Sequence, residues 1–237
     1  MSIRGTRSLC SLRTKTVFAV LAALFLVAFS TGVSSAKPAS VKASAGASTD
    51  GLVDHVTGTK TVLAVPFSTF QALAAGHIFA TFDKPAALTG FRYAGPGNID
   101  LLATFPINGG SLVGNSNLGT ITHAGGLTLT KTDANFHPVK SLKSTDLTIL
   151  NATTLLASAH ALDGTPIIGD LGAPSAVADM SHVVRTVNGD GSITLDADYT
   201  LNAVTAQVLN LYFDTTVFQA GLNMGQGTST ITTSGIL

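Results

Sequence analysis

The sequence predicts an all-β protein, an antiparallel β-sandwich with two short helices. From about Lys60 onward, short apolar runs rich in Val, Ile, Leu and Thr are separated by Gly, Asn and Pro. This pattern is typical of many short strands joined by turns. The segment Ile193–Leu201 alternates apolar and polar residues without a break, as expected for a strand with one dry and one wet face. About 180 residues with this pattern suffice for one domain, which we expect at 55–235.

The residues before this domain are typical of an export signal. A basic stretch precedes an apolar run from Val17 to Phe29, and Ser34–Ala36 then supplies the small residues of a cleavage site. We therefore predict a cleaved signal peptide at 1–36 and a flexible linker at 37–54, because the small polar residues there cannot form a core. The alternative is an uncleaved anchor, although a run of 13 residues is short for a bilayer span.

Composition excludes several functions. The chain has no Glu and no Trp, and its single cysteine, Cys10, lies inside the predicted signal. The mature protein would therefore have no disulfide, no thiolate nucleophile and no cysteine-based zinc site. Cleavage after Ala36 would leave nine basic residues against 13 Asp, a net charge of −4. This charge and the scattered basic residues argue against binding to nucleic acid or to a membrane surface.

The strands of the predicted sheet follow from alternation and turn signals. Asn188–Gly191 is a strong turn signal that would pair 181–187 with 193–201 as a hairpin. Residues 119–130 and 146–150 are similar half-wet segments.

Two segments are predicted as helices. Ser68 and Gln71 fit a capping box and Gly76 a C-terminal stop, which gives a helix over 69–75. In 202–213 the apolar residues recur at helical spacing, which predicts a buried face formed by Val204, Val208, Leu211 and Tyr212.

Motifs for catalysis and metal binding are weak, so we expect no enzymatic activity. No G-x-S-x-G elbow or paired-histidine metal motif occurs. Asn188–Ser192 begins like a calcium loop but lacks the later Gly and Glu, so a solvated turn explains it better. The pairs Gly109–Gly110 and Gly125–Gly126 lie between strands, which favours bulges or turns over a phosphate loop.

His123 is the residue that most invites a functional interpretation. It shares the apolar face of its strand with Ile121 and ends that strand beside a glycine pair. It is either a hydrogen-bonded residue that fixes the turn or an accessible contact for a ligand.

The segment around His123 resembles a known motif. Gly119–Leu129, which contains H-x-G-G-L-x-L, with Pro138 after it, is similar to the central motif of haem-transport-associated (HtaA-like) domains. Leu195–Gly225 is similar to the closing unit of that family, and Phe105–Gly110 fits related exported proteins. The resemblance covers roughly residues 60–230. It implies an exported bacterial module of β-sandwich type that binds haem.

The resemblance also implies site residues. In haem-binding members an early tyrosine supplies the iron ligand and the motif histidine, here His123, supports it. The corresponding opening, Phe67–Gln71, contains no tyrosine, and Tyr93 is the only tyrosine before His123. A ferric haem would then take His123 or His77 as its ligand, or else Tyr93.

The sequence therefore predicts a secreted, non-enzymatic binding protein with haem or another small ligand as its partner. The alternative is a structural protein that self-associates or contacts cell-surface components through its polar sheet faces, in the medium or at the cell wall.

Overall fold

The computed structural model describes residues 53–114, 116–164 and 174–234. The predicted signal peptide and residues 37–52 of the predicted linker lie outside these ranges. Neither helix within them is long and apolar enough to span a bilayer. The elements in chain order are β1 (Val53–Pro66), α2 (Phe67–Ala75), β2 (Ile78–Asp83), β3 (Ala87–Gly95), β4 (Asn98–Val113), β5 (Gly119–His123), β6 (Gly126–Thr132), β7 (Pro138–Leu150), β8 (Thr154–Ala161), β9 (Ser175–Val187), β10 (Ile193–Leu201), α3 (Ala203–Phe213) and β11 (Asn223–Ser234).

The strands form one antiparallel sheet that closes on itself. Eight strands follow the order β7-β5-β4-β1-β11-β10-β9-β8, and a further pairing between β8 and β7 completes the ring. The prediction of an all-β fold with two short helices is confirmed. The predicted division into two sheets is not what the pairing shows, because hydrogen bonds continue from strand to strand around a barrel. Closure removes most free edges, which would otherwise expose unpaired backbone groups.

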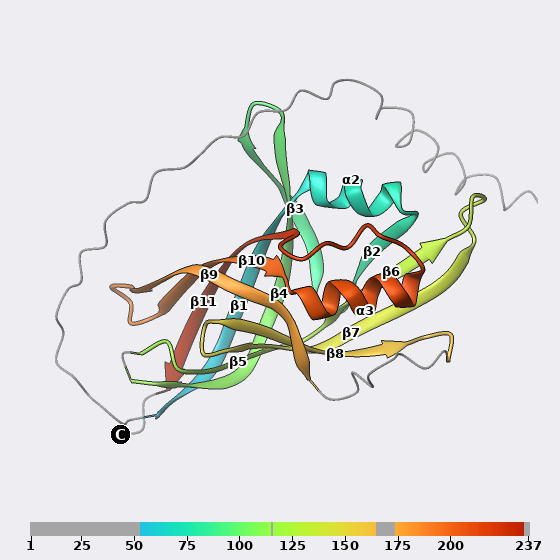
Figure 1. Ribbon diagram of the computed structural model, residues 1–237. Coiled ribbons are helices and arrows are strands. Elements are labelled where there is room, and N and C mark those ends of the chain that lie inside the picture. Colours follow the sequence, from blue (N-terminus) through green and yellow to red (C-terminus); the bar gives the residue numbers. More distant parts are fainter. Residues whose placement is uncertain (1–52, 115, 165–173, 235–237) are drawn as a thin grey trace, which may run out of the picture. The chain divides into compact units, whose positions relative to one another are not determined.

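Three strands extend this barrel. β6 pairs with β7 beside β5, β2 continues outward from β6, and β3 pairs with β4 alone. Figure 1 shows the β3–β4 hairpin extending beyond the start of α2. Among the described strands, β2 and β3 therefore carry the free edges of the sheet.

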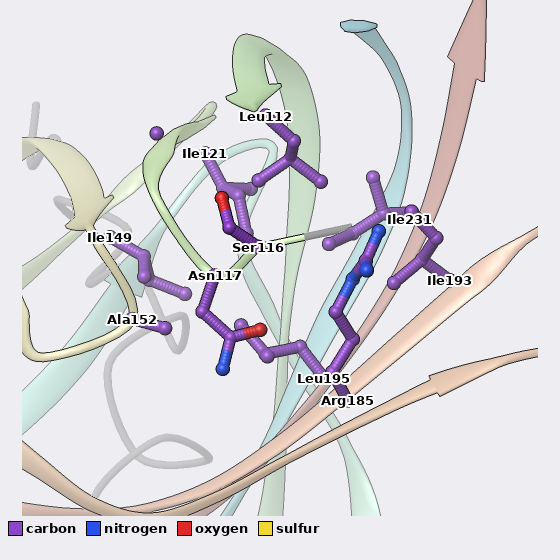
Figure 2. A pocket seen from close by; sticks show the side chains of 11 residues that line it. Leu112, Ser116, Asn117, Ile121, Ile149, Ala152, Arg185, Ile193, Leu195 and Ile231 are labelled. Carbon is purple, nitrogen blue, oxygen red and sulfur yellow. The ribbon is translucent and has the colours of Figure 1, made fainter. Parts of the chain in front are cut away.

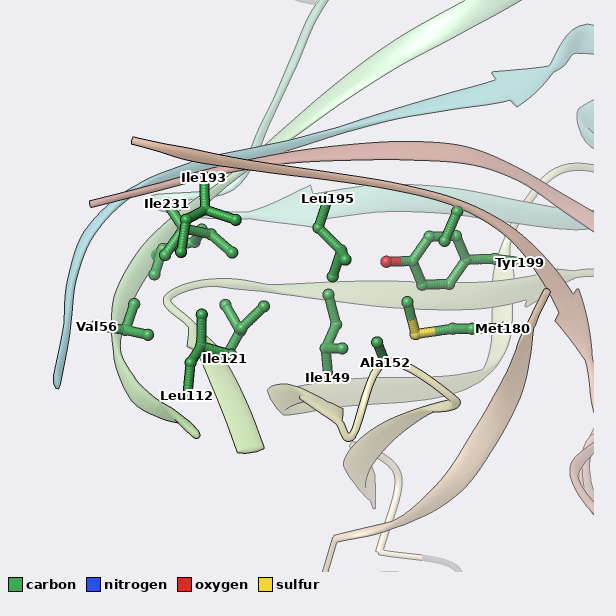
Figure 3. Packing of buried hydrophobic residues seen from close by; sticks show 12 residues of the cluster. Val56, Leu112, Ile121, Ile149, Ala152, Met180, Ile193, Leu195, Tyr199 and Ile231 are labelled. Carbon is green, nitrogen blue, oxygen red and sulfur yellow. The ribbon is translucent and has the colours of Figure 1, made fainter. Parts of the chain in front are cut away.

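The barrel interior is filled by the alternate side chains of its strands. Ile193–Leu201 alternates between buried and half-buried residues, as predicted. Its inward side chains meet those of neighbouring strands, and Figure 3 shows Leu195 and Tyr199 beside Ile149 and Met180. The predicted hairpin is also present, since β9 and β10 pair across the turn at 188–192. Asn188, Asp190 and Ser192 hydrogen-bond one another in that turn.

A second core cluster holds α3 against the sheet. The buried side chains of α3 are those of Thr205, Ala206, Leu209, Tyr212 and Phe213. The predicted face is wrong in two positions, because Val204 and Leu211 are exposed. In a helix of mostly apolar residues several stripes have helical spacing, and the sheet selects the one that ends in Phe213. Lys131 and Lys140 donate to the carbonyl oxygens of residues 212–214, which are the unpaired groups at the helix end.

The other helix, α2, begins differently from the prediction. It starts at Phe67 directly after Pro66, and no side chain caps it. Ser68 therefore lies in the first turn, where it cannot act as the N-cap of a capping box. The predicted stop at Gly76 is confirmed, and a Cβ there would lie 2.7 Å from the Val217 side chain.

Candidate functional site

His123, the last residue of β5, lies inside the barrel and is only 6% exposed. Its Nε2 is 2.7 Å from the Thr61 hydroxyl on β1, which is 2.7 Å from the Ser229 hydroxyl on β11. Its Nδ1 is 3.1 Å from the carbonyl oxygen of Leu147 on β7. The chain of hydrogen bonds thus joins four barrel strands across the interior. The sequence correctly predicted that His123 lies on an apolar face, but the strand end is not accessible.

The directions of these hydrogen bonds follow from their chemistry. A carbonyl oxygen only accepts, so Nδ1 carries the proton and donates to Leu147. Nε2 then accepts from the Thr61 hydroxyl, which in turn accepts from Ser229. Both ring nitrogens of His123 are thereby occupied in the neutral form. To contact a ligand, the ring would have to give up one of these bonds.

The carbonyl group that His123 contacts lies at a break in the strand pairing of β7. Residues 138–144 of β7 pair with β6, whereas 148–150 pair with β5. Leu147 lies between the two ladders, where β5 ends and the chain turns through Gly125 into β6. The His123 ring donates a hydrogen bond to the Leu147 carbonyl at this break. We call this break between the two ladders the β7 seam.

Burial also makes this histidine sensitive to acid. Burial lowers the pKa of His123 from the ordinary value of 6.5, and the hydrogen bond to the Leu147 carbonyl opposes part of that effect. Below pH 6.5 the unfolded chain therefore binds a proton that the folded chain resists. The free energy of unfolding should fall as the pH drops below 6.5 towards the folded-state pKa, and it should gain nothing from His123 above 6.5. Urea unfolding between pH 4.5 and 7.5 would measure this.

The matched control is His123→Gln, whose amide both donates and accepts but does not titrate. Its unfolding free energy should depend less steeply on pH below 6.5 than that of the parent. Equal slopes for the two proteins would contradict the assignment.

Tyr93, unlike His123, is exposed and lies on the β3–β4 hairpin. It is 68% exposed and pairs with Ile99, while Phe91 is 76% exposed and pairs with Leu101. These four side chains share one face of the hairpin by alternation. We call it the hairpin face.

The hairpin face is an outward continuation of the barrel interior. Along β4, Ile99 and Leu101 are followed on the same side by Ala103 and Phe105, which are buried in a core cluster with Phe82. The same side of the strand is thus covered in the barrel and uncovered in the hairpin. An exposed aromatic patch of this kind is typical of an interaction site.

The reverse side of the hairpin is polar and well anchored. Arg92 donates from Nε and Nη2 to one carboxylate oxygen of Asp100, at 3.1 and 2.8 Å. Asp100 is buried, whereas about half of the Arg92 side chain is exposed. This pair fixes β3 to β4 and leaves the hairpin face free of charge.

His77 occupies a third, separate place between α2 and β2. It is exposed and has a positive φ of 57°. Its ring lies 6.4 Å from that of Phe136, which lies 6.1 Å from Phe79. No hydrogen bond or ring contact among the described residues joins His77, Tyr93 and His123 to one another. The three predicted site residues are therefore not one constellation.

The open end of the barrel holds a small apolar hollow that the sequence did not indicate. About 280 Å³ of free space, including the solvent at its mouth, lies among isoleucine and leucine side chains (Figure 2). Arg185 reaches into it and donates to the Gly114 carbonyl at 3.2 Å, while its Nε finds no partner among the described residues. Burial lowers the pKa of Arg185, and the charge of Asp54 opposes that effect. The part of this space that can hold a water molecule is only about 10 Å³, far below the roughly 300–1,000 Å³ of ligand pockets.

Comparison with solved structures identifies the architecture. The C-terminal domain of HtaA from Corynebacterium glutamicum superposes with a TM-score of 0.50 at 13% identity, over 76% of this chain and 99% of that domain. The chain has the fold of an HtaA domain. The resemblance stated from the sequence is thereby confirmed for the fold. No protein-family model and no curated protein matches the sequence.

Two further structures of HtaA-type proteins from the same organism are similar. The N-terminal domain of HtaA gives a TM-score of 0.45 at 17% identity, over 75% of this chain and 99% of that domain. The heme-binding protein HtaB gives 0.44 at 13% identity, over 78% and 96%. Residues Phe67–Gln71, where the resemblance implied a tyrosine ligand, include no tyrosine.

Thr61 and Ser229 are the site residues that sequence reasoning missed. They lie 62 and 106 positions from His123, in segments where Ser and Thr are abundant. No local signal distinguishes them from the other hydroxyl residues of β1 and β11.

Proposed function

We propose that this chain is an exported, non-catalytic binding module that takes a flat apolar ligand on the hairpin face, with haem as the first candidate. The observation that carries the proposal is the exposure of Phe91 and Tyr93 on a surface continuous with the barrel core. The HtaA-domain fold supports haem as the first ligand to test, since one structure with this architecture is a heme-binding protein.

Tyr93 is the proposed iron ligand. It belongs to the hairpin face, and tyrosine is an established axial ligand of ferric haem. The hairpin face would cover one side of the porphyrin and remove apolar area from water. His77, which is exposed beside Phe136, is the alternative ligand. His123 would support the barrel wall and would bind iron only after releasing Thr61 or Leu147.

Haemin titration of the purified protein should produce a shifted Soret band. Tyr93→Phe keeps the ring and removes only the hydroxyl, so it should weaken haemin binding by about tenfold or more, which equals ~1.4 kcal/mol. His77→Gln should bind like the parent. The measurement is the absorbance change as a function of haemin concentration.

Three results would contradict this assignment. An unshifted Soret band with the parent would remove haem as the ligand. Loss of binding in His77→Gln alone would move the ligand to His77. Unchanged binding in both variants would leave the ligand elsewhere in the chain.

Self-association is the second candidate function, and the free edge of β3 favours it. β3 presents unpaired backbone groups over Ala87–Gly95, next to the exposed Phe91 and Tyr93. A second molecule could extend the sheet at this edge. Light scattering should then show a mass that rises with concentration, and Phe91→Asp should hold the protein monomeric. A parent that stays monomeric at high concentration would contradict this function.

A further inference from the structure

A broad groove crosses the outside of the barrel, away from the hairpin face. It holds about 850 Å³ of free space, including solvent, and is the larger of the two hollows described here. It runs over the outer surface of β9, β10, β11 and β1 to the polar reverse side of the hairpin. Its lining includes Arg92, Asp100, His182, Asp198, Asn223 and Gln226.

Two hydrogen-bonded pairs form the opposite walls of this groove. Arg92 and Asp100 form one wall, and His182 and Asp198 form the other, with Nδ1 and Oδ2 2.9 Å apart. Asp100 lies on β4 and Asp198 on β10, and the strands β1 and β11 lie between them in the sheet. Three strand spacings separate the walls, roughly 14 Å along the sheet.

Small residues form part of the floor between the walls. Ala64 and Gly225 lie there, and a Cβ on Gly225 would come within 2.4 Å of the Ala64 carbonyl oxygen. The backbones of β1 and β11 are therefore close. The exposed Gln226 pairs with Ala64 on one side and with Asp198 on the other, so its side chain rises between the walls. Gln226 and Asn223 supply amide groups on β11.

The chemistry of the lining favours a neutral ligand rich in hydroxyl groups. Each wall combines a carboxylate with a nitrogen donor, so neither wall offers an isolated charge to a phosphate or a metal ion. Among the described residues, no phenylalanine or tyrosine side chain lines the groove, which disfavours a flat apolar ligand. Carboxylate, guanidinium and amide groups are planar and can each bind two neighbouring groups on a ligand.

We propose that this groove binds a short stretch of neutral polysaccharide, with sugar hydroxyls bridging from Asp198 and Gln226 to the Arg92–Asp100 wall. The span of the groove suits several linked sugars better than one. Sugar hydroxyls both donate and accept, which matches a wall that presents donors and acceptors together. The proposal concerns a different surface from the hairpin face and does not depend on haem binding.

Native affinity electrophoresis tests this directly. The purified full chain is run through gels that contain dextran, hydroxyethyl cellulose or arabinogalactan, with a polysaccharide-free gel as reference. At least one polysaccharide should retard the parent. Asp198→Asn and Gln226→Leu should each weaken that retention by about tenfold, since each removes hydrogen bonds to the sugar.

The matched control is Asp146→Asn, which makes the same chemical change on β7, outside the groove. It should be retained like the parent. Circular dichroism would establish that both groove variants remain folded. The proposal is overturned if no polysaccharide retards the parent, or if the groove variants are retained like the parent. Haemin titration of the same proteins is a separate readout, so either proposal can fail alone.

Discussion

Phe213→Ala is expected to lower the free energy of unfolding by about 3–5 kcal/mol, the range for truncating a buried phenylalanine. Phe213 ends α3 and is 0% exposed. Its ring packs edge-on against the Tyr212 ring, with 4.8 Å between the ring centroids. It also stacks on the Phe218 ring, with 6.0 Å between the centroids. Removal would leave a cavity between α3 and the sheet, because the strands beneath cannot move in to fill it. Urea unfolding followed by circular dichroism measures the change.

The control for this change lies two residues earlier on the same helix. Leu211 is 63% exposed, so Leu211→Ala should change the unfolding free energy by less than about 0.5 kcal/mol. Similar losses in the two variants would mean that α3 does not pack on its Phe213 side.

Gly110→Ala should cost at least about 2 kcal/mol of unfolding free energy. Gly110 has a φ of 134°, where side chains are strained, and a Cβ would lie 2.1 Å from the Thr120 carbonyl oxygen. It follows the bulge at which β4 shifts its register against β5. Two closely paired strands of the barrel would have to separate to admit one methyl group. Thermal or urea unfolding measures the loss.

Gly189→Ala is the matched control. No heavy atom lies within 4 Å of a Cβ at Gly189, and its φ is not in the strained range. The substitution should leave stability within about 0.5 kcal/mol of the parent. If Gly110→Ala were equally harmless, the close approach of β4 and β5 would be wrong.

Local sequence patterns predicted the strands but not how they close. Alternation in Ile193–Leu201 and the turn at Asn188–Gly191 are short-range signals, and both are confirmed. A sandwich and a barrel require the same inward and outward residues in each strand. The difference lies in pairings such as His55 with Ser234, which join segments almost the whole described chain apart. No local sequence feature in either segment identifies the strand with which it pairs.

The same limit applies to the candidate sites. Alternation placed His123 on the inner face beside Ile121, yet its partners Thr61 and Ser229 come from distant strands. Sequence reasoning named Tyr93 but did not single out the exposed face that it shares with Phe91, because alternation does not reveal whether another element covers a strand. Coverage depends on where β3 leaves the barrel, which is a property of the whole sheet.

The pairing of the first and last strands has a consequence for attachment. Val53 pairs with Val113, and Ser234 with His55, so both chain ends of the barrel leave from one rim. The hairpin face stands at the other end of β1, where Pro66 pairs with Asp100, and 14 residues of strand span about 45 Å. A tether attached at either end would therefore anchor the barrel at this rim, and the aromatic hairpin would lie at the far end from the anchor. A circular permutation that joins these ends and opens the chain in a loop at the other rim would reverse that orientation and leave the strands uncut.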